Sequence, residues 1–154
     1  MQAPTSGWAR VVGYDVQRQL EQVRNHLGFC PQCNVLFDQL TVAEHIHFYA
    51  SLRGIPNDQI KLEIEHLLDV LGFKDKRDCR NKTLSGEQKL SVAIAFVGNT
   101  SAVFLDEPIV GVDPYSRRSI WDLVMKLKAG RTIILAPGCV FELHRAHSQE
   151  IGIL

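Results

Sequence analysis

The chain has 154 residues, with 17 basic and 17 acidic side chains and a formal net charge of zero. This length suits one domain with a single core, and the even charge balance argues against nucleic acid or an anionic membrane surface as a partner. No apolar run approaches the roughly 20 residues of a membrane helix, and the N-terminus lacks the basic and apolar stretches of a secretory signal.

The first elements predicted along the chain are short. Residues 8–12 form a β-rich run that Gly13 closes. Residues 17–26 carry Leu20 and Val23 at helical spacing, which predicts a short amphipathic helix. Residues 27–29 form a brief apolar run that ends at Pro31, and we interpret this run as a second strand.

Two longer helices are predicted next. Thr41 and Glu44 have capping-box spacing, so a helix is expected to start there and to end near Arg53. Asn57 is expected to cap the following helix, and Gly72 stands where a C′ glycine belongs. The apolar stripe of that helix consists of Ile60, Ile64, Leu67, Leu68 and Leu71. Residues 74–82 are highly charged and are expected to form a solvated loop.

The second half predicts helix, strand, helix and strand. Ser85 and Gln88 repeat the capping-box spacing before a helix that is apolar over residues 90–97. Residues 102–105 form an apolar strand. Asp113 followed by Pro114 is a strong helix start, and this helix is expected to end by Gly130. Residues 132–135 form the last β-branched run. A closing strand–helix–strand unit implies a parallel pair of strands.

The four cysteines are Cys30, Cys33, Cys79 and Cys139, and their spacing shows no disulfide framework. A reduced, cytosolic setting is therefore favoured. Cys30 and Cys33 form a C-x-x-C pair, a spacing that can serve redox or zinc chemistry. Because no second pair with zinc spacing follows, we favour two unrelated thiols.

Two adjacent acids, Asp106 and Glu107, follow the all-apolar strand at residues 102–105. Such a strand suits the middle of a parallel sheet, where ligands bind at the carboxyl ends of the strands. Asp106 is therefore a candidate Mg²⁺ ligand, directly or through water. Glu107 is a candidate base that orients and deprotonates an attacking water. The alternative is a helix cap or a solvated turn.

Two further positions carry candidate chemistry. Ser85 and Gly86 stand at a predicted helix N-terminus, where a hydroxyl, backbone N–H groups and the helix dipole can bind an anion. A plain N-cap is the alternative. Gln32 follows a predicted strand at a point from which its amide could reach a metal or a water molecule, and the alternative is an ordinary surface residue.

The order of these features resembles the ATP-binding-cassette (ABC) family, with Gln32 as the Q-loop, residues 84–86 as the signature, residues 106–108 as Walker B and residues 111–113 as the D-loop. The amino-acid sequence itself resembles subfamily A, the lipid-transporting members, in six stretches, which are residues 30–32, 34–38, 40–45, 48–50, 89–98 and 111–121. The likeness covers roughly residues 4–135.

This resemblance implies an α/β fold, a partial P-loop NTPase-like core with parallel strands plus an α-helical signature subdomain. The partial nucleotide-binding domain would span residues 1–135, with its helical subdomain at about 34–98, and residues 136–154 would form a divergent C-terminal tail. The family implies ATP and Mg²⁺ as cofactors. It implies a second cassette and transmembrane domains as partners, a lipid substrate only indirectly, and no nucleic acid. The expected location is the cytoplasmic face of a membrane as part of a transporter, and the cytoplasm for the isolated chain.

The resemblance also assigns roles to single residues. Gln32 and Glu107 would be catalytic, and Asp106 and Gln32 would bind the metal. Gln32 would also face the coupling helix of the membrane domain. The contacts to the nucleotide and the partner cassette would come from Ser85, Gly86 and Asp113.

Several family features are missing or altered in this sequence. The Walker A loop G-x-x-x-x-G-K-[ST], whose backbone amides and lysine grip the phosphates, is absent, and residues 4–7 match the stretch that normally follows it. Gly138 stands where the switch histidine is expected. Glu87 replaces the second signature glycine and would repel a γ-phosphate. The distance from the signature to Walker B is about two residues short, which is roughly 3 Å of helix rise and would displace Ser85.

Three hypotheses follow for this chain. The first is a nucleotide-binding domain fragment of a subfamily A transporter, whose family couples ATP hydrolysis to lipid transport, with the isolated chain inactive. The second is a truncated, non-catalytic splice or decayed-gene product that acts at most as an interaction module, through helices near residues 64–71 and 90–97. The third is an incomplete gene model. Because the family places the Walker A strand inside the sheet, unpaired strand edges are expected here.

Overall fold

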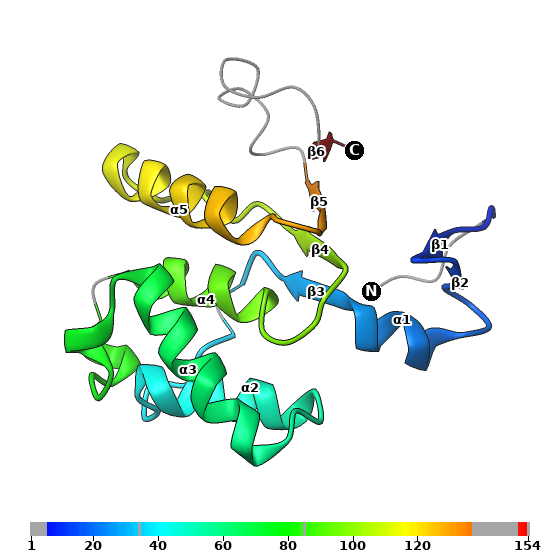
Figure 1. Ribbon diagram of the computed structural model, residues 1–154. Helices are drawn as coiled ribbons and strands as arrows, with labels where there is room; N and C mark the ends of the chain where they lie inside the picture. The colour runs from blue at the N-terminus through cyan, green and yellow to red at the C-terminus, as the bar shows by residue number, and fades with distance from the viewer. Residues whose placement is uncertain (1–5, 34, 85, 137–150, 154) are drawn as a thin grey trace.

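The computed structural model describes residues 6–33, 35–84, 86–136 and 151–153 (Figure 1). It confirms an α/β architecture with a parallel sheet. The elements are, in chain order, β1 (Arg10–Val11), β2 (Tyr14–Asp15), α1 (Leu20–His26), β3 (Leu27–Cys30), α2 (Val42–Leu52), α3 (Asn57–Leu71), the 3₁₀ turns η1 (Lys74–Lys76) and η2 (Asn81–Thr83), α4 (Glu87–Ala95), β4 (Ala102–Leu105), α5 (Pro114–Leu127), β5 (Thr132–Leu135) and β6 (Ile151–Ile153).

The main sheet has four parallel strands in the order β3-β4-β5-β6. Its register aligns Cys30 with Leu105 and Leu105 with Leu135. These three side chains are fully buried, and they belong to the same hydrophobic core as apolar residues of α4 and α5. Figure 1 shows both helices on one side of the sheet. One face of the sheet is therefore sealed by helices.

The opposite face of the sheet is only partly covered by the described residues. Phe29, Phe104 and Ile134 share one row across β3, β4 and β5. The rings of Phe29 and Phe104 stack with centroids 5.6 Å apart, yet Phe29 remains 37 % exposed. A parallel sheet is normally buried on both faces. The two faces of this sheet thus differ in how well they are packed.

The helices between β3 and β4 follow the local signals of the sequence closely. The capping box of α2 forms with both hydrogen bonds, and α2 ends at Leu52 with Arg53 as its C-cap, which confirms the prediction. Helix α3 buries the whole predicted apolar stripe, and Gly72 ends the helix in the left-handed conformation at φ +69°. The starts of β4, α5 and β5 are also confirmed.

The helical region and the sheet meet at a very close contact between β3 and α4. An atom added at the Cβ position of Gly28 would lie 1.8 Å from the carbonyl oxygen of Ala95. No residue other than glycine fits at this point without movement of the backbone. Gly28 therefore sets how closely α4 packs on the sheet.

Two local predictions were wrong, and a third was confirmed only in part. Asn57 is the first residue of α3, and Pro56 is its N-cap, with no side-chain hydrogen bond. The N-cap of α4 is Gly86, so this helix starts one residue after the position that Ser85 predicted, and Ser85 itself lies outside the described residues. The charged segment at residues 74–82 is not simply a solvated loop, because it contains η1 and η2 and buries Asn81.

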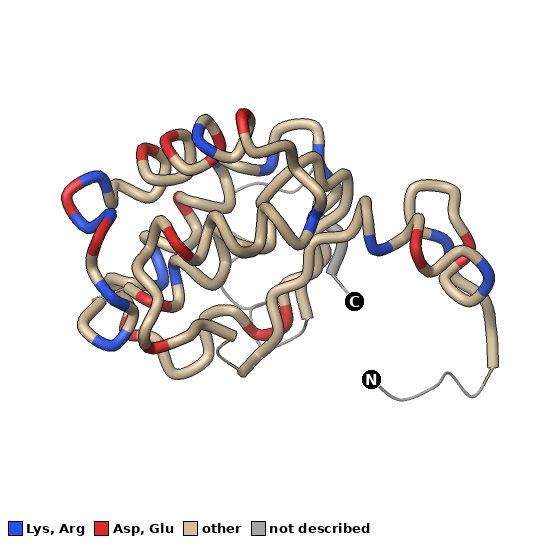
Figure 2. The backbone as a smooth tube through the Cα atoms, turned by 90° about the horizontal axis from the view of Figure 1, so that it is seen from below, with Lys and Arg blue, Asp and Glu red and all other residues tan. Residues whose placement is uncertain are grey.

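The N-terminal part differs from its prediction in length. Helix α1 begins at Leu20, because the Asp15 carboxylate accepts hydrogen bonds from the Gln17 and Arg18 amides and holds a turn there. Within α1, Val23 is buried and Leu20 is 45 % exposed. Figures 1 and 2 both place β1, β2 and α1 to one side of the remaining elements.

Within the part of the chain that the structure describes, the expectation of unpaired strand edges is met at one edge of the sheet, at β3, and not at β5. Strand β3 has no neighbour on its outer side among the described residues. Strand β5, in contrast, pairs with β6, which was not predicted because three residues are too few for a recognisable pattern. Gly138, which stands where the switch histidine is expected, lies outside the described residues.

Two surface properties bear on the choice of partner. Basic and acidic positions are intermixed along the tube in Figure 2 and do not form a face of one sign. Within the described ranges, no helix combines the length and the apolar character needed to cross a bilayer.

Candidate functional site

The predicted Q-loop and Walker B residues meet where β3 and β4 end. The Asp106 amide donates a hydrogen bond to the Cys30 carbonyl at 2.8 Å, which continues the strand pairing beyond the last residues of the two strands. Just beyond it, Gln32 Nε2 donates to Glu107 Oε2 at 2.6 Å. Two residues that are 75 positions apart in the sequence are thereby brought into direct contact.

Glu107 has an unusual backbone conformation, with φ +47°. This value lies in the left-handed region, which residues other than glycine rarely adopt. Such a conformation costs of order 1–3 kcal/mol and is often found at functional sites. The surrounding turn is held by a hydrogen bond from Gln88 Nε2 of α4 to the Pro108 carbonyl at 3.0 Å. Helix α4 thus supports the turn that presents the Glu107 carboxylate.

The donor atoms at this end of the sheet suit Mg²⁺. Asp106 is partly buried and offers carboxylate oxygens, and the Gln32 amide oxygen is also a hard donor. No group of three or more His, Cys, Asp or Glu residues within the described ranges could hold a metal ion. Mg²⁺ does not need such a group, because it usually takes one or two carboxylates and completes its shell with water and substrate phosphates.

The signature segment leads directly into α4. Gly86 is the N-cap, with φ +106°, and being a glycine it offers no side chain that could cap the first amides of α4. Glu87 is the first helical residue, and its Oε2 lies 3.5 Å from Asn81 Nδ2. The acidic side chain at this position therefore has a favourable place at the positive end of the helix.

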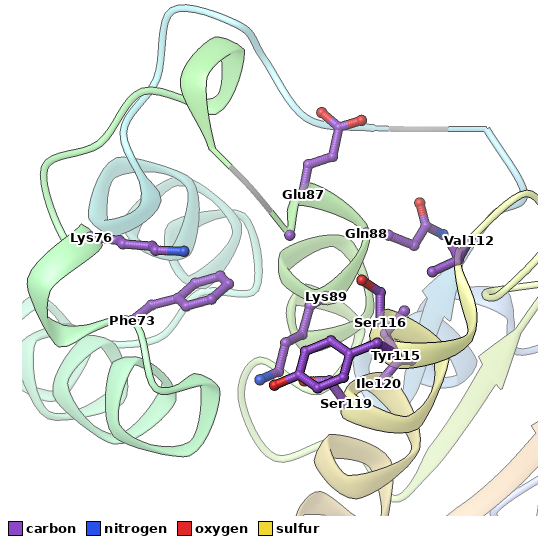
Figure 3. Close-up of a pocket in the computed structure, with 11 residues that line it drawn as sticks. Phe73, Lys76, Glu87, Gln88, Lys89, Val112, Tyr115, Ser116, Ser119 and Ile120 are labelled. Atoms are coloured by element: carbon purple, nitrogen blue, oxygen red, sulfur yellow. The ribbon is translucent and has the colours of Figure 1, made fainter.

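A cavity of about 460 Å³ opens beside this segment, between the first turns of α4 and α5 and the ring of Phe73 (Figure 3). Lys76 Nζ and Lys89 Nζ lie 5.1 and 5.6 Å from the Phe73 ring centroid. Lys89 also donates to the Leu71 carbonyl at 2.8 Å, and burial lowers its pKa. No local sequence pattern marks this cavity, because its lining comes from three separate segments.

Asp113 lies at the start of α5, where the prediction of an N-cap is confirmed. Its Oδ1 accepts hydrogen bonds from the amides of Tyr115 and Ser116, both at 3.0 Å. Hydrogen bonds from Ser116, through its side chain and its amide, hold the pKa of this carboxyl below its usual value. At least one oxygen of Asp113 is therefore committed to the cap.

The C-x-x-C pair does not form a shared site. Cys30 is fully buried, with its sulfur 3.7 Å from Ser91 Oγ, whereas Cys33 is exposed. Burial raises the pKa of the Cys30 thiol, so this residue stays protonated and unreactive. The interpretation as two unrelated thiols fits this arrangement better than a redox or zinc site.

Comparison with known proteins gives consistent matches. The family model for ABC transporters matches residues 1–110. Over 135 residues, the chain is 51 % identical to ATP-binding cassette sub-family A member 2 of Rattus norvegicus and 54 % identical to the retinal-specific phospholipid-transporting ATPase ABCA4 of Homo sapiens. Each match covers 86 % of this chain but only 6 % of the relative, so the chain spans a small part of these proteins.

A solved structure of the ATP-binding subunit of an ABC transporter has a similar fold. Its TM-score is 0.70 at 24 % sequence identity, and the match covers 92 % of this chain and 60 % of that chain. At this identity the likeness concerns the fold alone.

Proposed function

Because this chain belongs to the ABC transporter family, and over 135 residues resembles members of its sub-family A, we propose that it forms part of a nucleotide-binding domain that couples ATP binding and hydrolysis to lipid transport. The relatives include proteins named as phospholipid-transporting ATPases, which supports a lipid substrate for the complete transporter. The domain would span residues 1–135, with its helical subdomain at about 34–98.

The observation that carries the proposal is the hydrogen bond of 2.6 Å between Gln32 Nε2 and Glu107 Oε2. A carboxylate held by an amide at the carboxyl ends of two parallel strands is well placed to act on a ligand bound there. We assign Glu107 as the base that orients and deprotonates the attacking water, and Gln32 as the residue that senses both this water and the metal.

Asp106 is proposed to hold Mg²⁺ together with Gln32, directly or through water. When it is bound, Mg²⁺ supplies positive charge that stabilises the charge developing on the transferred phosphoryl group. The protein's own contribution is to fix the positions of the Asp106 and Glu107 carboxylates. The Cys30–Asp106 and Gln88–Pro108 hydrogen bonds serve this purpose.

The remaining assignments concern a partner cassette. Ser85, which lies outside the described residues, and Gly86 would contact the γ-phosphate of a nucleotide held by the opposite cassette, and Asp113 would contact that cassette directly. Among the residues that the structure describes, no side chain caps the first amides of α4, which supports an anion at this helix end. The partners would be this cassette and the transmembrane domains, at the cytoplasmic face of a membrane.

We also propose that these 154 residues are inactive by themselves, because the family's main grip on the phosphates, the Walker A loop, is not in the sequence. Titration of the chain with a fluorescent ATP analogue tests this proposal. We expect no saturable signal up to millimolar concentration. Binding at millimolar affinity or better that unlabelled ATP competes away would contradict it.

The site assignments are best tested in a complete transporter. A chimera can carry this chain's residues in place of the 135 that match in the human retinal-specific phospholipid-transporting ATPase ABCA4. We expect low ATPase activity, which rises in the Glu87→Gly variant because a negative charge beside the γ-phosphate is removed. In that background, Glu107→Gln and Asp106→Asn should each abolish hydrolysis, and the matched change Asp122→Asn on α5 should not. Unchanged hydrolysis by Glu107→Gln would overturn the assignment of the base.

The alternative function, an interaction module, would need the apolar faces of two helices to be exposed, and these faces are buried. The helices near residues 64–71 and 90–97 bury their apolar side chains in the chain's own core. These stripes are therefore unavailable to a partner in the folded chain.

A further inference from the structure

His45 on α2 is a fully buried histidine with a hydrogen bond at each ring nitrogen. Nδ1 lies 2.8 Å from the Thr41 carbonyl oxygen, and Nε2 accepts the Phe37 amide N–H at 2.8 Å. A carbonyl oxygen can only accept and an amide N–H can only donate, so Nδ1 must carry the proton and Nε2 must not. Both bonds form together only in the neutral ring with the proton on Nδ1.

Tyr49, one turn further along α2, holds the same loop at a second point. Its hydroxyl donates to the Val35 carbonyl at 2.8 Å. The Phe37 ring also packs against the His45 ring, with centroids 6.2 Å apart and an interplanar angle of 22°. Two side chains of one helix thus bind the backbone of residues 35–37, three to five residues after Gln32.

We infer that His45 is a positioning residue for Gln32: in its neutral form it anchors, with Tyr49, the loop that carries Gln32 to α2, and its protonation releases that loop. An anchored loop leaves Gln32 little freedom, which favours its 2.6 Å hydrogen bond to Glu107. A protonated His45 would set an N–H against the Phe37 N–H, so this anchor could not persist. The inference rests on the proposed function only for the role of Gln32.

Few charged groups surround His45 among the described residues. Glu44 precedes it on α2 and is engaged in the capping box with Thr41. Arg80 reaches this area because Thr41 pairs with it in an isolated antiparallel bridge. Asp38 follows Phe37 in the loop itself. Tyr49 stays protonated, because burial raises its pKa.

The balance of these effects favours neutral His45. Burial lowers its pKa from the ordinary value of 6.5, and this outweighs the hydrogen bond to Thr41 and the charge of Glu44, which both raise it. Because the pKa is lower in the folded chain than in the unfolded chain, the folded form binds fewer protons. The anchor is therefore intact above pH 6.5 and is lost as the pH falls through the folded-state value.

The test is an NMR study of the full ¹⁵N-labelled chain. Imidazole spectra at neutral pH should show His45 with the proton on Nδ1. On acidification, protonation of His45 should coincide with a protection factor for exchange of the Phe37 amide that falls on the order of tenfold, and with a change in the Gln32 side-chain amide signal. Glu44→Gln should keep this pH response, which separates it from titration of the capping box. His47, an exposed histidine on the same helix, is the matched control, and His47→Gln should change neither signal.

Three variants separate positioning from simple packing. His45→Phe keeps a ring of similar size without either nitrogen and should release the Phe37 amide and alter the Gln32 signal at all pH values. His45→Gln keeps an acceptor within reach of Phe37 and should restore protection without pH dependence. Tyr49→Phe removes only the hydrogen bond to the Val35 carbonyl, so it should free the backbone at residue 35 in part and leave the bond between His45 and Phe37 in place. If His45→Phe fails to fold, the titration of the wild type and the His45→Gln variant still show whether His45 positions Gln32 or only packs in the core.

A His45 ring with its proton on Nε2, or a Gln32 signal that ignores His45 protonation, would overturn the inference. Neither readout involves ATP, so a failure here is distinct from a failure of the chimera to hydrolyse ATP.

Discussion

The helical region, α2 to α4, and the sheet differ in how completely they bury their apolar side chains. In the helical region, apolar side chains point inward from several sides, and residues such as Ile46, Leu67 and Leu90 are at most 1 % exposed. The sheet is sealed on the face toward α4 and α5, but its other face leaves Phe29 37 % exposed. The helical region is thus a closed core, while the sheet is closed on one side within the described residues.

This difference separates what is local from what is long-range. A helix satisfies its own backbone hydrogen bonds, and α2 and α3 need only each other and α4 to bury their stripes. A parallel sheet depends on strands and covering elements from distant parts of a chain. We therefore expect the helical region to carry most of the stability of this chain, and the exposed face to contribute little.

The largest effect should come from Phe73→Ala. Phe73 follows α3, is only 5 % exposed and belongs to the main core, so its truncation should lower the free energy of unfolding by about 3–5 kcal/mol. The same substitution at Phe29, on the partly exposed sheet face, should cost less than about 2 kcal/mol. Urea denaturation monitored by circular dichroism measures both changes. Equal losses would mean that the sheet face is as well packed as the helical core.

The second effect concerns the junction of the two regions. Gly28→Ala would place a methyl group 1.8 Å from the Ala95 carbonyl oxygen, so α4 or β3 must move. We expect a loss of about 3 kcal/mol, at the upper end of the range for overpacked sites.

Gly130→Ala is the matched control for this change. Gly130 has φ +71°, and no atom of the described residues lies within 4 Å of its Cβ position, so the Gly130→Ala change should cost only the backbone penalty of about 1 kcal/mol. A Gly28→Ala variant as stable as the Gly130→Ala variant would show that α4 and the sheet can separate without cost.

Sequence reasoning succeeded where one segment carries the whole signal. The Thr41–Glu44 capping box, Gly72 at the end of α3 and the Asp113–Pro114 start of α5 all involve neighbouring residues, and all are confirmed. It failed at Asn57 and at the start of α4, where a proline and a glycine take the cap position and the polar side chain does not. Cap identity depends on the backbone conformation, which the residue type only biases.

The candidate site shows the same division. The acids after β4 were recognisable because an apolar strand ending in two carboxylates is itself informative. The roles of Gln32 and Glu107 near one ligand were implied only by the family resemblance, and their hydrogen bond was not predicted, since 75 residues separate them. The role of His45 left no signal, because its two hydrogen bonds go to backbone atoms, and any residue type at Thr41 or Phe37 would supply those atoms.

The smallest effect tests whether the local signals of the helical region act independently of its core. Thr41 Oγ1 accepts the Glu44 amide at 3.2 Å, so Thr41→Ala should lower the free energy of unfolding by about 1 kcal/mol. Thr41→Ser keeps the hydroxyl and should lie within a few tenths of a kcal/mol of the wild type. If the cap and the core act independently, Thr41→Ala should cost the same amount in the Phe73→Ala background. A clearly larger loss there would mean that cap and core form one cooperative unit, and the closed core would then extend to the N-terminus of α2.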